Sequence, residues 1–319
     1  DQFGTEGWVP LDGVSAHTKV DEATGELMFF NYSKHAPYMH YGVVGPDNKL
    51  KHYIPVPLAG PRLPHDMAFT KNYAIVNDMP LYWDPALLER NLHVVQFHPD
   101  QKTRFGIIPR MGQPEDIRWF EAEPTYTLHW LNAWEEGDEI ILDGYYQEEP
   151  QPKSHPDAPD GLERMMAYLS QGLMKPKLHR WRFNLKTGAT IEERMDDRIL
   201  EFGMINQKYA GRKYRYAYSA VPEPCWFLFT GLVKHDLETG RSEEINFGPG
   251  RYGSESPFAP RINAQDEDDG YLVSFIADVE NDRSECVLID AKNFAAGPVC
   301  RIILPERFCS GTHSVWANG

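Results

Sequence analysis

The chain has 319 residues, of which 41% are hydrophobic and 25% charged, a composition typical of a globular protein with a sizeable core. Its 47 acidic and 32 basic side chains give a formal net charge of −15, which argues against binding to the phosphates of nucleic acids. No segment approaches the ~20 apolar residues that span a bilayer and no signal peptide is evident, so we expect a cytoplasmic protein that can at most touch a membrane surface.

Short strands dominate the chain, because Pro and Gly, 25 of each, interrupt most windows before a helical period is complete. The predicted strands are rich in β-branched and aromatic residues and cover residues 92–99, 138–147, 179–185, 225–237, 271–278, 286–290 and 300–305. Residues 162–174 give the best amphipathic helical pattern and follow a proline-rich loop. We therefore expect an all-β chain forming one domain over residues 1–319, with a loop and helix inserted at about 148–175.

One hairpin recurs three times, always with a Thr-Gly pair in a tight turn between two strands. It occupies residues 19–30, 182–194 and 234–247. Glycine supplies the positive φ that such turns require. The glycines at 188, 240 and 297 follow one another after 52 and 57 residues, near the length of a four-stranded propeller blade. This period favours a β-propeller over a β-sandwich.

The four cysteines are Cys225, Cys286, Cys300 and Cys309. They form no CxxC pair and no cluster with the spacing of a zinc site. We expect reduced thiols that are mostly buried.

Twelve histidines are candidates for a metal site, although a single histidine is more often a surface or core residue than a ligand. His93 and His98 flank one predicted strand, so their side chains point to opposite faces. His155 lies in the proline-rich loop. Five others have polar or tyrosine-rich surroundings without an evident carboxylate partner: His35, His40, His52, His179 and His235.

The remaining candidates stand in distinctive strings, SAHTK (15–19), PHDMAFTKNYAIV (64–76), LHWLNAWEEGDEIILD (128–143) and SGTHSVW (310–316). Each imidazole lies at the edge of a predicted strand beside small residues or a tight turn. The gaps of 48, 64 and 184 residues correspond to about one, one and three to four blades. Because the inner ends of propeller blades meet at the central axis, these histidines can converge there, but spacing alone does not select them from the twelve.

These strings, together with EFGMINQKYAGRKYRYAY, SESPFAPR and EDDGYLVSF, resemble in order and spacing the motifs of the carotenoid cleavage oxygenases. That family includes lignostilbene dioxygenases and apocarotenoid oxygenases, and the resemblance extends from Ala16 to the C-terminus. It implies a seven-bladed β-propeller with Fe(II) on its axis, held by His17, His65, His129 and His313 without a carboxylate ligand. Neutral imidazoles suit ferrous iron and leave positions open for dioxygen and substrate.

In the family, glutamates accept the outer N–H of three of the histidines, which fixes the tautomer of each ring. The resemblance places two of them, with Glu201 orienting His129 and Glu255 orienting His313. Read on their own, both glutamates would be surface carboxylates.

The third glutamate of the family has no counterpart in this sequence. It is expected to serve His65, but only sixteen residues precede His17, and Glu6 lies too close to that histidine to match. We therefore expect the N-terminal part of the propeller, including the first blade, to be missing from the sequence.

The resemblance implies oxidative cleavage of a carbon–carbon double bond to two carbonyl products, with both oxygen atoms from O2 and with the alkene held in an apolar tunnel. Phe69, Trp130 and Phe258 are candidate tunnel residues, and plain core packing is the alternative for each. The strings EFGMINQKYAGRKYRYAYS and RFCSGTHSVW favour the stilbene-cleaving, lignostilbene branch, whose phenol-gripping Tyr and Lys would lie in the missing part. Cleavage of an apocarotenoid is the alternative.

A function of another class is a catalytically silent propeller that binds a ligand or partner. The missing glutamate favours it, and the four histidines oppose it. A phosphohydrolase metal site built on residues 64–66 is a further alternative, but such sites are built on helices and this segment reads as strand or turn. The sequence leaves the oligomeric state open.

Overall fold

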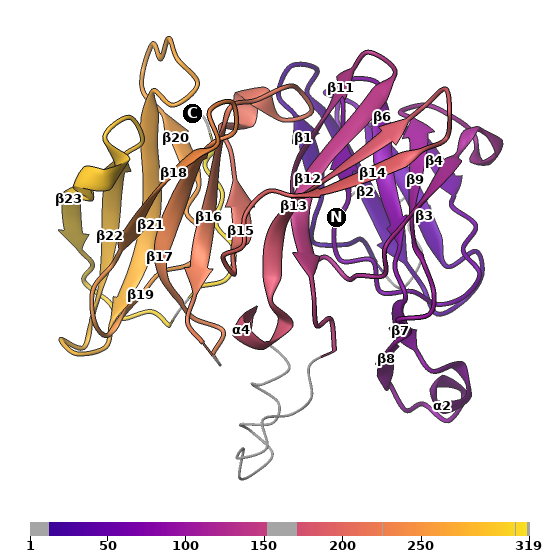
Figure 1. The fold of residues 1–319 in the computed structure, drawn as a ribbon, viewed down its shortest axis with the longest axis horizontal. Helices are drawn as coiled ribbons and strands as arrows, with labels where there is room; N and C mark the ends of the chain where they lie inside the picture. The colour runs from indigo at the N-terminus through magenta and orange to yellow at the C-terminus, as the bar shows by residue number, and fades with distance from the viewer. Residues whose placement is uncertain (1–12, 152–170, 225, 310, 318–319) are drawn as a thin grey trace. The chain divides into compact units, whose positions relative to one another are not determined.

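The computed structural model describes residues 13–151, 171–224, 226–309 and 311–317, and these are almost entirely strands, turns and loops (Figure 1). The chain divides into two compact units. The first comprises Asp1–Gln151, His179–Glu193 and Ala210–Arg212, and the second comprises Pro152–Leu178, Arg194–Tyr209 and Lys213–Gly319. The single domain expected over residues 1–319 stays a prediction.

Three four-stranded sheets hold nearly all strands of the first unit. The first sheet has the order β1-β2-β3-β4, with strands at Lys19–Asp21, Glu26–Tyr32, Met39–Val44 and Leu50–Pro55. The second has the order β10-β9-β6-β5, with strands at Arg118–Ala122, Thr103–Pro109, Tyr73–Asp78 and Ala68–Phe69. The third has the order β11-β12-β13-β14, with strands at Trp130–Glu136, Glu139–Gln147, Pro176–Asn184 and Thr190–Arg194.

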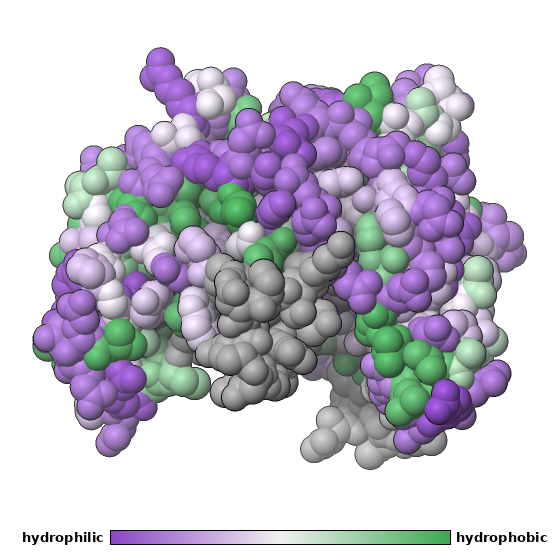
Figure 2. All heavy atoms as spheres, turned by 60° about the horizontal axis from the view of Figure 1, so that its bottom comes forward, coloured by the Kyte–Doolittle hydropathy of each residue, from purple (hydrophilic) through white to green (hydrophobic). Residues whose placement is uncertain are grey.

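Between β6 and β9 the chain leaves the second sheet and forms a separate hairpin, β7 (Leu81–Trp83) and β8 (Val95–Phe97), with helix α2 (Pro85–Glu89) between them. Asp84 caps this helix, because its carboxylate accepts the first free N–H groups. The short 3-10 helix η1 (Pro114–Asp116) precedes β10. Hydrophobic side chains gather over the β7–β8 hairpin (Figure 2, lower right).

Two further sheets form the second unit. One has the order β15-β16-β17-β18, with strands at Glu201–Met204, Tyr216–Pro222, Phe229–Asp236 and Arg241–Asn246. The other has the order β19-β21-β22-β23, with strands at Arg251–Tyr252, Gly270–Asp278, Arg283–Asp290 and Pro298–Ile303, and β20 (Phe258–Pro260) also pairs with β21.

The described helical segments of the second unit are short: α4 (Gln171–Met174), η2 (Gln207–Tyr209) and η3 (Phe294–Ala296). Of the helix predicted at 162–174, the structure describes only this last turn, α4. Most of the loop and helix expected at about 148–175 lies outside the described residues.

The repeated Thr-Gly hairpin is confirmed, and its copies share one set of hydrogen bonds. In each copy the glycine has a positive φ of 69–76° and its N–H donates to the carbonyl of the residue four positions earlier. That earlier residue also accepts, through its side-chain Oδ1, the N–H two positions ahead of it. The glycines are Gly25, Gly188 and Gly240, and the accepting residues are Asp21, Asn184 and Asp236.

The glycine period coincides with the blade period. Gly188 joins the third and fourth strands of one sheet, Gly240 joins those of the next, and Gly297 lies between β22 and β23 of the sheet that follows. Gly25 is different, because it joins the first and second strands of its sheet. From the third described sheet onward, one of these glycines therefore lies between the third and the fourth strand of the sheet order.

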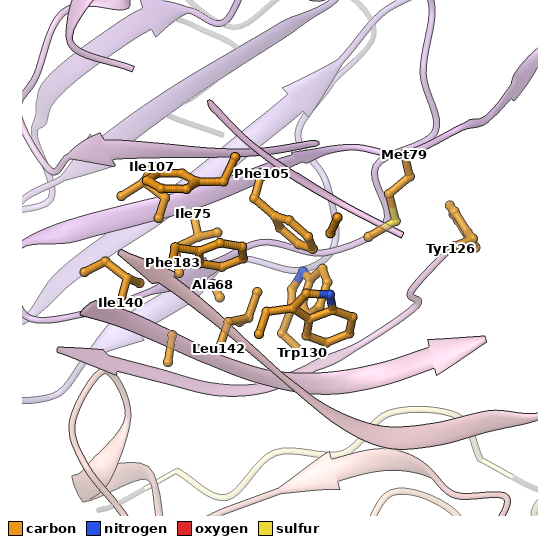
Figure 3. Close-up of a cluster of buried hydrophobic side chains, with 14 of the residues drawn as sticks. Ala68, Ile75, Met79, Phe105, Ile107, Tyr126, Trp130, Ile140, Leu142 and Phe183 are labelled. Atoms are coloured by element: carbon orange, nitrogen blue, oxygen red, sulfur yellow. The ribbon is translucent and has the colours of Figure 1, made fainter. Parts of the chain in front are cut away.

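Each unit has its own hydrophobic core. In the first unit Phe105, Trp130 and Trp181 meet with ring centroids 5.5–5.7 Å apart, and the two tryptophans are nearly perpendicular. Figure 3 shows Phe105 and Trp130 in this cluster together with Phe183. Edge-to-face pairs of this kind add about 0.5–1.5 kcal/mol each to the stabilisation from burial alone.

The structure also bears on the predicted absence of membrane spans and on the cysteines. Among the described residues, no helix is long and apolar enough to cross a membrane. Cys286, Cys300 and Cys309 are free thiols, but Cys300 and Cys309 are exposed, so the expectation of mostly buried cysteines is wrong for these two edge and loop residues. Cys225 lies outside the described residues.

A buried ion cluster ties β1 and the β1–β2 turn to two other segments of the first unit. Arg110 donates to Asp21 at 2.7 Å and to Glu26 at 2.9 Å, and Arg212 donates to Asp21 at 2.9 Å. Asp21 and Arg110 are both buried, so each charge depends on the other. Burial raises the pKa of the Asp21 carboxyl, but hydrogen bonds from Arg212 and Arg110 outweigh it and hold this pKa below its ordinary value.

Substitution of Asp21 by Ala leaves Arg110 buried without its main counter-charge, so we expect the free energy of unfolding to fall by roughly 3–5 kcal/mol. Chemical denaturation at pH 7 measures the loss. The control is Asp47→Ala, which removes an exposed 2.7 Å ion pair to Lys51 and is expected to change stability little, because water screens exposed pairs.

The same difference has a defined pH dependence. Because the folded pKa of Asp21 lies below the unfolded value of about 3.9, its contribution is complete above that pH and is lost as the pH falls further. The gap between wild type and Asp21→Ala therefore narrows in acid. Equal losses for Asp21→Ala and Asp47→Ala at pH 7 would contradict the role of this cluster.

Candidate metal centre

Three histidines stand at equivalent places in the three sheets of the first unit. His17 lies two residues before β1, His65 lies three residues before β5, and His129 immediately precedes β11. Each of these strands is the edge strand of its sheet. The local sequence therefore delivers one imidazole per sheet from the loop that enters the edge strand.

The three imidazoles form one cluster. The Nε2 atoms of His17 and His65 are 3.0 Å apart, and the ring centroids lie 4.6 Å apart for His17 and His65, 4.9 Å for His17 and His129, and 5.2 Å for His65 and His129. One ligand atom from each ring falls within 4.8 Å of the other two. A set of three imidazole nitrogens at this spacing has the geometry needed to hold one metal ion.

The environment keeps the His17 imidazole in the form that binds a metal. Burial is the main cause that lowers the pKa of His17 to about 3, and the nearby positive charge that His129, His65 and Lys19 can carry lowers it further. The Asp66 carboxylate opposes this shift. At neutral pH the ring is uncharged and keeps a nitrogen lone pair, as a metal ligand must.

The second unit contains the other predicted site residues. His313 Nδ1 lies 3.1 Å from Glu255 Oε2, and the same carboxylate oxygen accepts the backbone N–H of Ser314 at 3.0 Å. With Nδ1 donating to a carboxylate, the lone pair of His313 is on Nε2. The structure thus brings His313 and Glu255 together.

Glu201 lies at the start of β15 and is fully buried. Its carboxylate accepts the backbone N–H of Phe202. The predicted pairing of Glu201 with His129 would join residues of the two different units and stays a prediction, as does the convergence of His313 with the other three histidines.

Phe202 adopts a backbone conformation that is unusual for a bulky residue. Its φ is +51°, it is buried, and it lies within a bulge between Glu201 and Met204. Its ring packs edge-on against the His313 imidazole, with centroids 5.2 Å apart. Strained backbone of this kind costs on the order of 1–3 kcal/mol and is concentrated at functional sites. Nothing in the sequence around Phe202 indicates it.

The three candidate tunnel residues are core residues. Phe69 lies beneath the Arg110 guanidinium and against Gly211, Trp130 donates its indole N–H to the Asp66 carbonyl, and Phe258 packs on Tyr218. All three candidates are at most 5% exposed. The core interpretation of these side chains therefore holds.

Two charged neighbours of the histidine cluster were not predicted from the sequence. Lys19 lies two residues after His17 and Asp66 lies one residue after His65, and their side chains form an ion pair of 2.7 Å inside the first unit. The strings AHTK and PHD show a basic residue after His17 and an acidic residue after His65, but the pairing of the two depends on a contact across 47 residues.

The chain is similar to known proteins over nearly its whole length. The family model described as retinal pigment epithelial membrane protein matches residues 1–318. The chain is 35% identical over 323 residues to a carotenoid 9,10(9',10')-cleavage dioxygenase of Pisum sativum, covering 95% of the chain and 58% of the relative. It is 29% identical to a carotenoid cleavage oxygenase of Mycobacterium tuberculosis, covering 99% of the chain and 72% of the relative.

The chain is also similar to solved structures of oxygenases. The lignostilbene dioxygenase of Pseudomonas brassicacearum matches with a TM-score of 0.82 and 26% identity over 96% of the chain and 66% of that structure. A cobalt-substituted apocarotenoid oxygenase of Synechocystis matches with a TM-score of 0.86 and 25% identity over 98% of the chain and 66% of that structure. These likenesses confirm the predicted propeller fold. The chain spans just under three fifths, 57–58%, of the length of the four plant relatives that are named carotenoid 9,10(9',10')-cleavage dioxygenases.

The position of Trp130 beside His129 can be tested through packing. Gly144 faces Trp130 across the β11–β12 pair, and a Cβ on Gly144 would lie 2.4 Å from the indole ring. We expect Gly144→Ala to lower the free energy of unfolding by roughly 1–3 kcal/mol, measured by chemical denaturation. Gly60→Ala is the control, since its Cβ would meet only the flexible end of Arg62, at 3.2 Å. A Gly144→Ala protein as stable as this control would refute the close packing.

Proposed function

Because the chain belongs to the carotenoid cleavage oxygenase family, we propose that it holds ferrous iron and cleaves a carbon–carbon double bond of an apolar conjugated alkene, using O2 and yielding two carbonyl products. The observation that carries the proposal is the cluster of His17, His65 and His129, whose ring nitrogens can share one ion. A structural neighbour that was solved with cobalt in place of its native metal supports a metal site in this fold.

The four histidines would hold the metal, and His313 would complete the set. When bound, ferrous iron supplies a place where dioxygen is activated next to the alkene. Residues of the chain keep the histidine ligands in the form that binds the metal. Burial keeps the His17 imidazole neutral, and Glu255 holds the proton on Nδ1 of His313 so that Nε2 presents its lone pair. Because all four proposed ligands are neutral, the ion keeps its full charge.

The proposed substrate is a carotenoid or apocarotenoid, or a stilbene. The plant relatives named for carotenoid 9,10-cleavage, at 34–35% identity, support the first class. The lignostilbene dioxygenase structure, at 26% identity, supports the second, which the sequence motifs also favour. Both classes present a conjugated alkene with long apolar surface, so one mechanism serves either.

The proposal is tested by loading the purified protein with Fe(II) without oxygen, then measuring O2 uptake with an apocarotenoid and with a hydroxylated stilbene. We expect one iron per chain, and two carbonyl products that carry oxygen from 18O2. His129→Ala lowers metal affinity by at least about 10-fold, by analogy with the loss of supporting partners at metal sites.

His179→Ala is the matched control, since His179 is a buried histidine of similar exposure that packs on Trp181 and is not a member of the cluster. It is expected to reduce stability and leave iron binding unchanged. Absence of iron binding and of O2 uptake with either substrate would favour the catalytically silent propeller.

We further propose that the β7–β8 hairpin rests on a membrane surface, from which an apolar alkene can be taken up. Leu92 and Val94 in this hairpin are 44% and 48% exposed, an unfavourable arrangement in water.

Liposome co-sedimentation is expected to decrease for the Leu92→Glu, Val94→Glu double variant. Val299→Glu, at an exposed apolar position on β23, is the control. Equal binding by both variant proteins would argue against this contact.

A further inference from the structure

The Asp66 carboxylate is the meeting point of the three segments that carry the clustered histidines. Its Oδ1 accepts the backbone N–H of Met67 at 2.7 Å and lies 2.7 Å from Lys19 Nζ. Its Oδ2 accepts the backbone N–H of Trp130 at 2.9 Å and lies 3.0 Å from Lys19 Nζ. Asp66 is 2% exposed, so these contacts replace water almost completely.

Each group that Asp66 binds adjoins one of the three histidines in the chain. Lys19 follows His17 by two residues, Asp66 itself follows His65, and Trp130 follows His129. The contacts join residues that are 47 and 64 positions apart in the sequence, so they link segments that enter different sheets. We propose that Asp66, with Lys19, is a positioning residue that fixes the mutual spacing of His17, His65 and His129.

The Asp66 segment is itself held at its backbone. Its carbonyl oxygen accepts the Asn77 amide N–H at 2.7 Å and the Trp130 indole N–H at 3.3 Å. Ser15 adds a second link, because its hydroxyl donates to the His65 carbonyl at 3.3 Å and accepts the backbone N–H of His17 at 3.4 Å. Hydrogen bonds therefore hold both the side chain and the backbone of Asp66, and this fixes the position of the adjoining His65.

Asp66 acts on the histidines from outside the ligand set. Both of its carboxylate oxygens already accept two contacts each, and the group of close ligand atoms among the described residues consists of the three histidines without Asp66. Metal sites require ligand placement within about 0.5 Å, so a loosened anchor weakens binding even when every ligand is present. This inference rests on the proposed metal site.

Lys19→Met distinguishes positioning from simple electrostatics. Removing a positive charge near a cation site strengthens cation binding if charge alone matters. If Lys19 helps Asp66 to hold the three segments, its loss weakens binding. We expect Lys19→Met and Asp66→Asn each to lower the affinity for Co(II) by roughly 10- to 100-fold and to change the visible absorption spectrum of bound Co(II).

Asp143→Asn is the matched control. Asp143 is 1% exposed and is paired with Arg180 at 2.8 and 2.9 Å in the same unit. This ion pair joins β12 to β13, whereas the Asp66 contacts join the segments that carry the clustered histidines. The substitution is expected to lower stability without changing the Co(II) affinity or spectrum.

The outcomes separate the two proposals. Wild-type protein that binds no Co(II) overturns the metal site and this inference with it. Wild-type binding with unchanged or tighter Co(II) affinity in Lys19→Met, and an unchanged spectrum, overturns the positioning role alone. If Asp66→Asn does not fold, the Lys19→Met result decides, because Lys19 is partly exposed and its removal leaves both backbone donors on Asp66.

Discussion

Three imidazoles packed against one another, two of them with Nε2 atoms 3.0 Å apart, are an arrangement that the remainder of the first unit must impose. Uncharged rings gain at most a hydrogen bond of about 1 kcal/mol at this contact, and protonated rings repel. The fold imposes the cluster by ending three loops at three edge strands, β1, β5 and β11, and by tying those loops together through the Asp66 carboxylate. The Asp21–Arg110 pair then secures the far end of β1.

In the second unit a histidine is also held in a fixed orientation, but by a direct hydrogen bond from its ring. His313 is oriented by a direct carboxylate contact from Glu255, whose position is in turn fixed by the backbone of Ser314. Phe202 supports the ring from its edge, at the expense of a left-handed backbone in a buried aromatic residue. Both units therefore orient histidines through carboxylates, by a backbone clamp in one unit and a direct hydrogen bond in the other.

Much of the fold could be predicted because it is encoded locally. Gly188, Gly240 and Gly297 mark successive blades, since a tight turn needs positive φ wherever it occurs. The roles of Lys19, Asp66 and Phe202 could not be predicted in this way, because they depend on contacts across 47 and 64 residues or on a strained bulge. The exposure of Cys300 was missed for a similar reason, since it depends on which strand lies at the sheet edge.

We propose that histidines alone bind the metal and that carboxylates only orient them. X-ray absorption at the iron edge of the Fe(II)-loaded protein tests this proposal. We expect the iron to be coordinated by imidazole nitrogens from four histidines, with any oxygen ligand coming from water. The imidazole scattering is expected to stay unchanged when Asp66 is replaced by Asn and the metal is supplied in excess. Coordination by fewer than three imidazoles, or the loss of a carboxylate oxygen on that substitution, would refute the proposal.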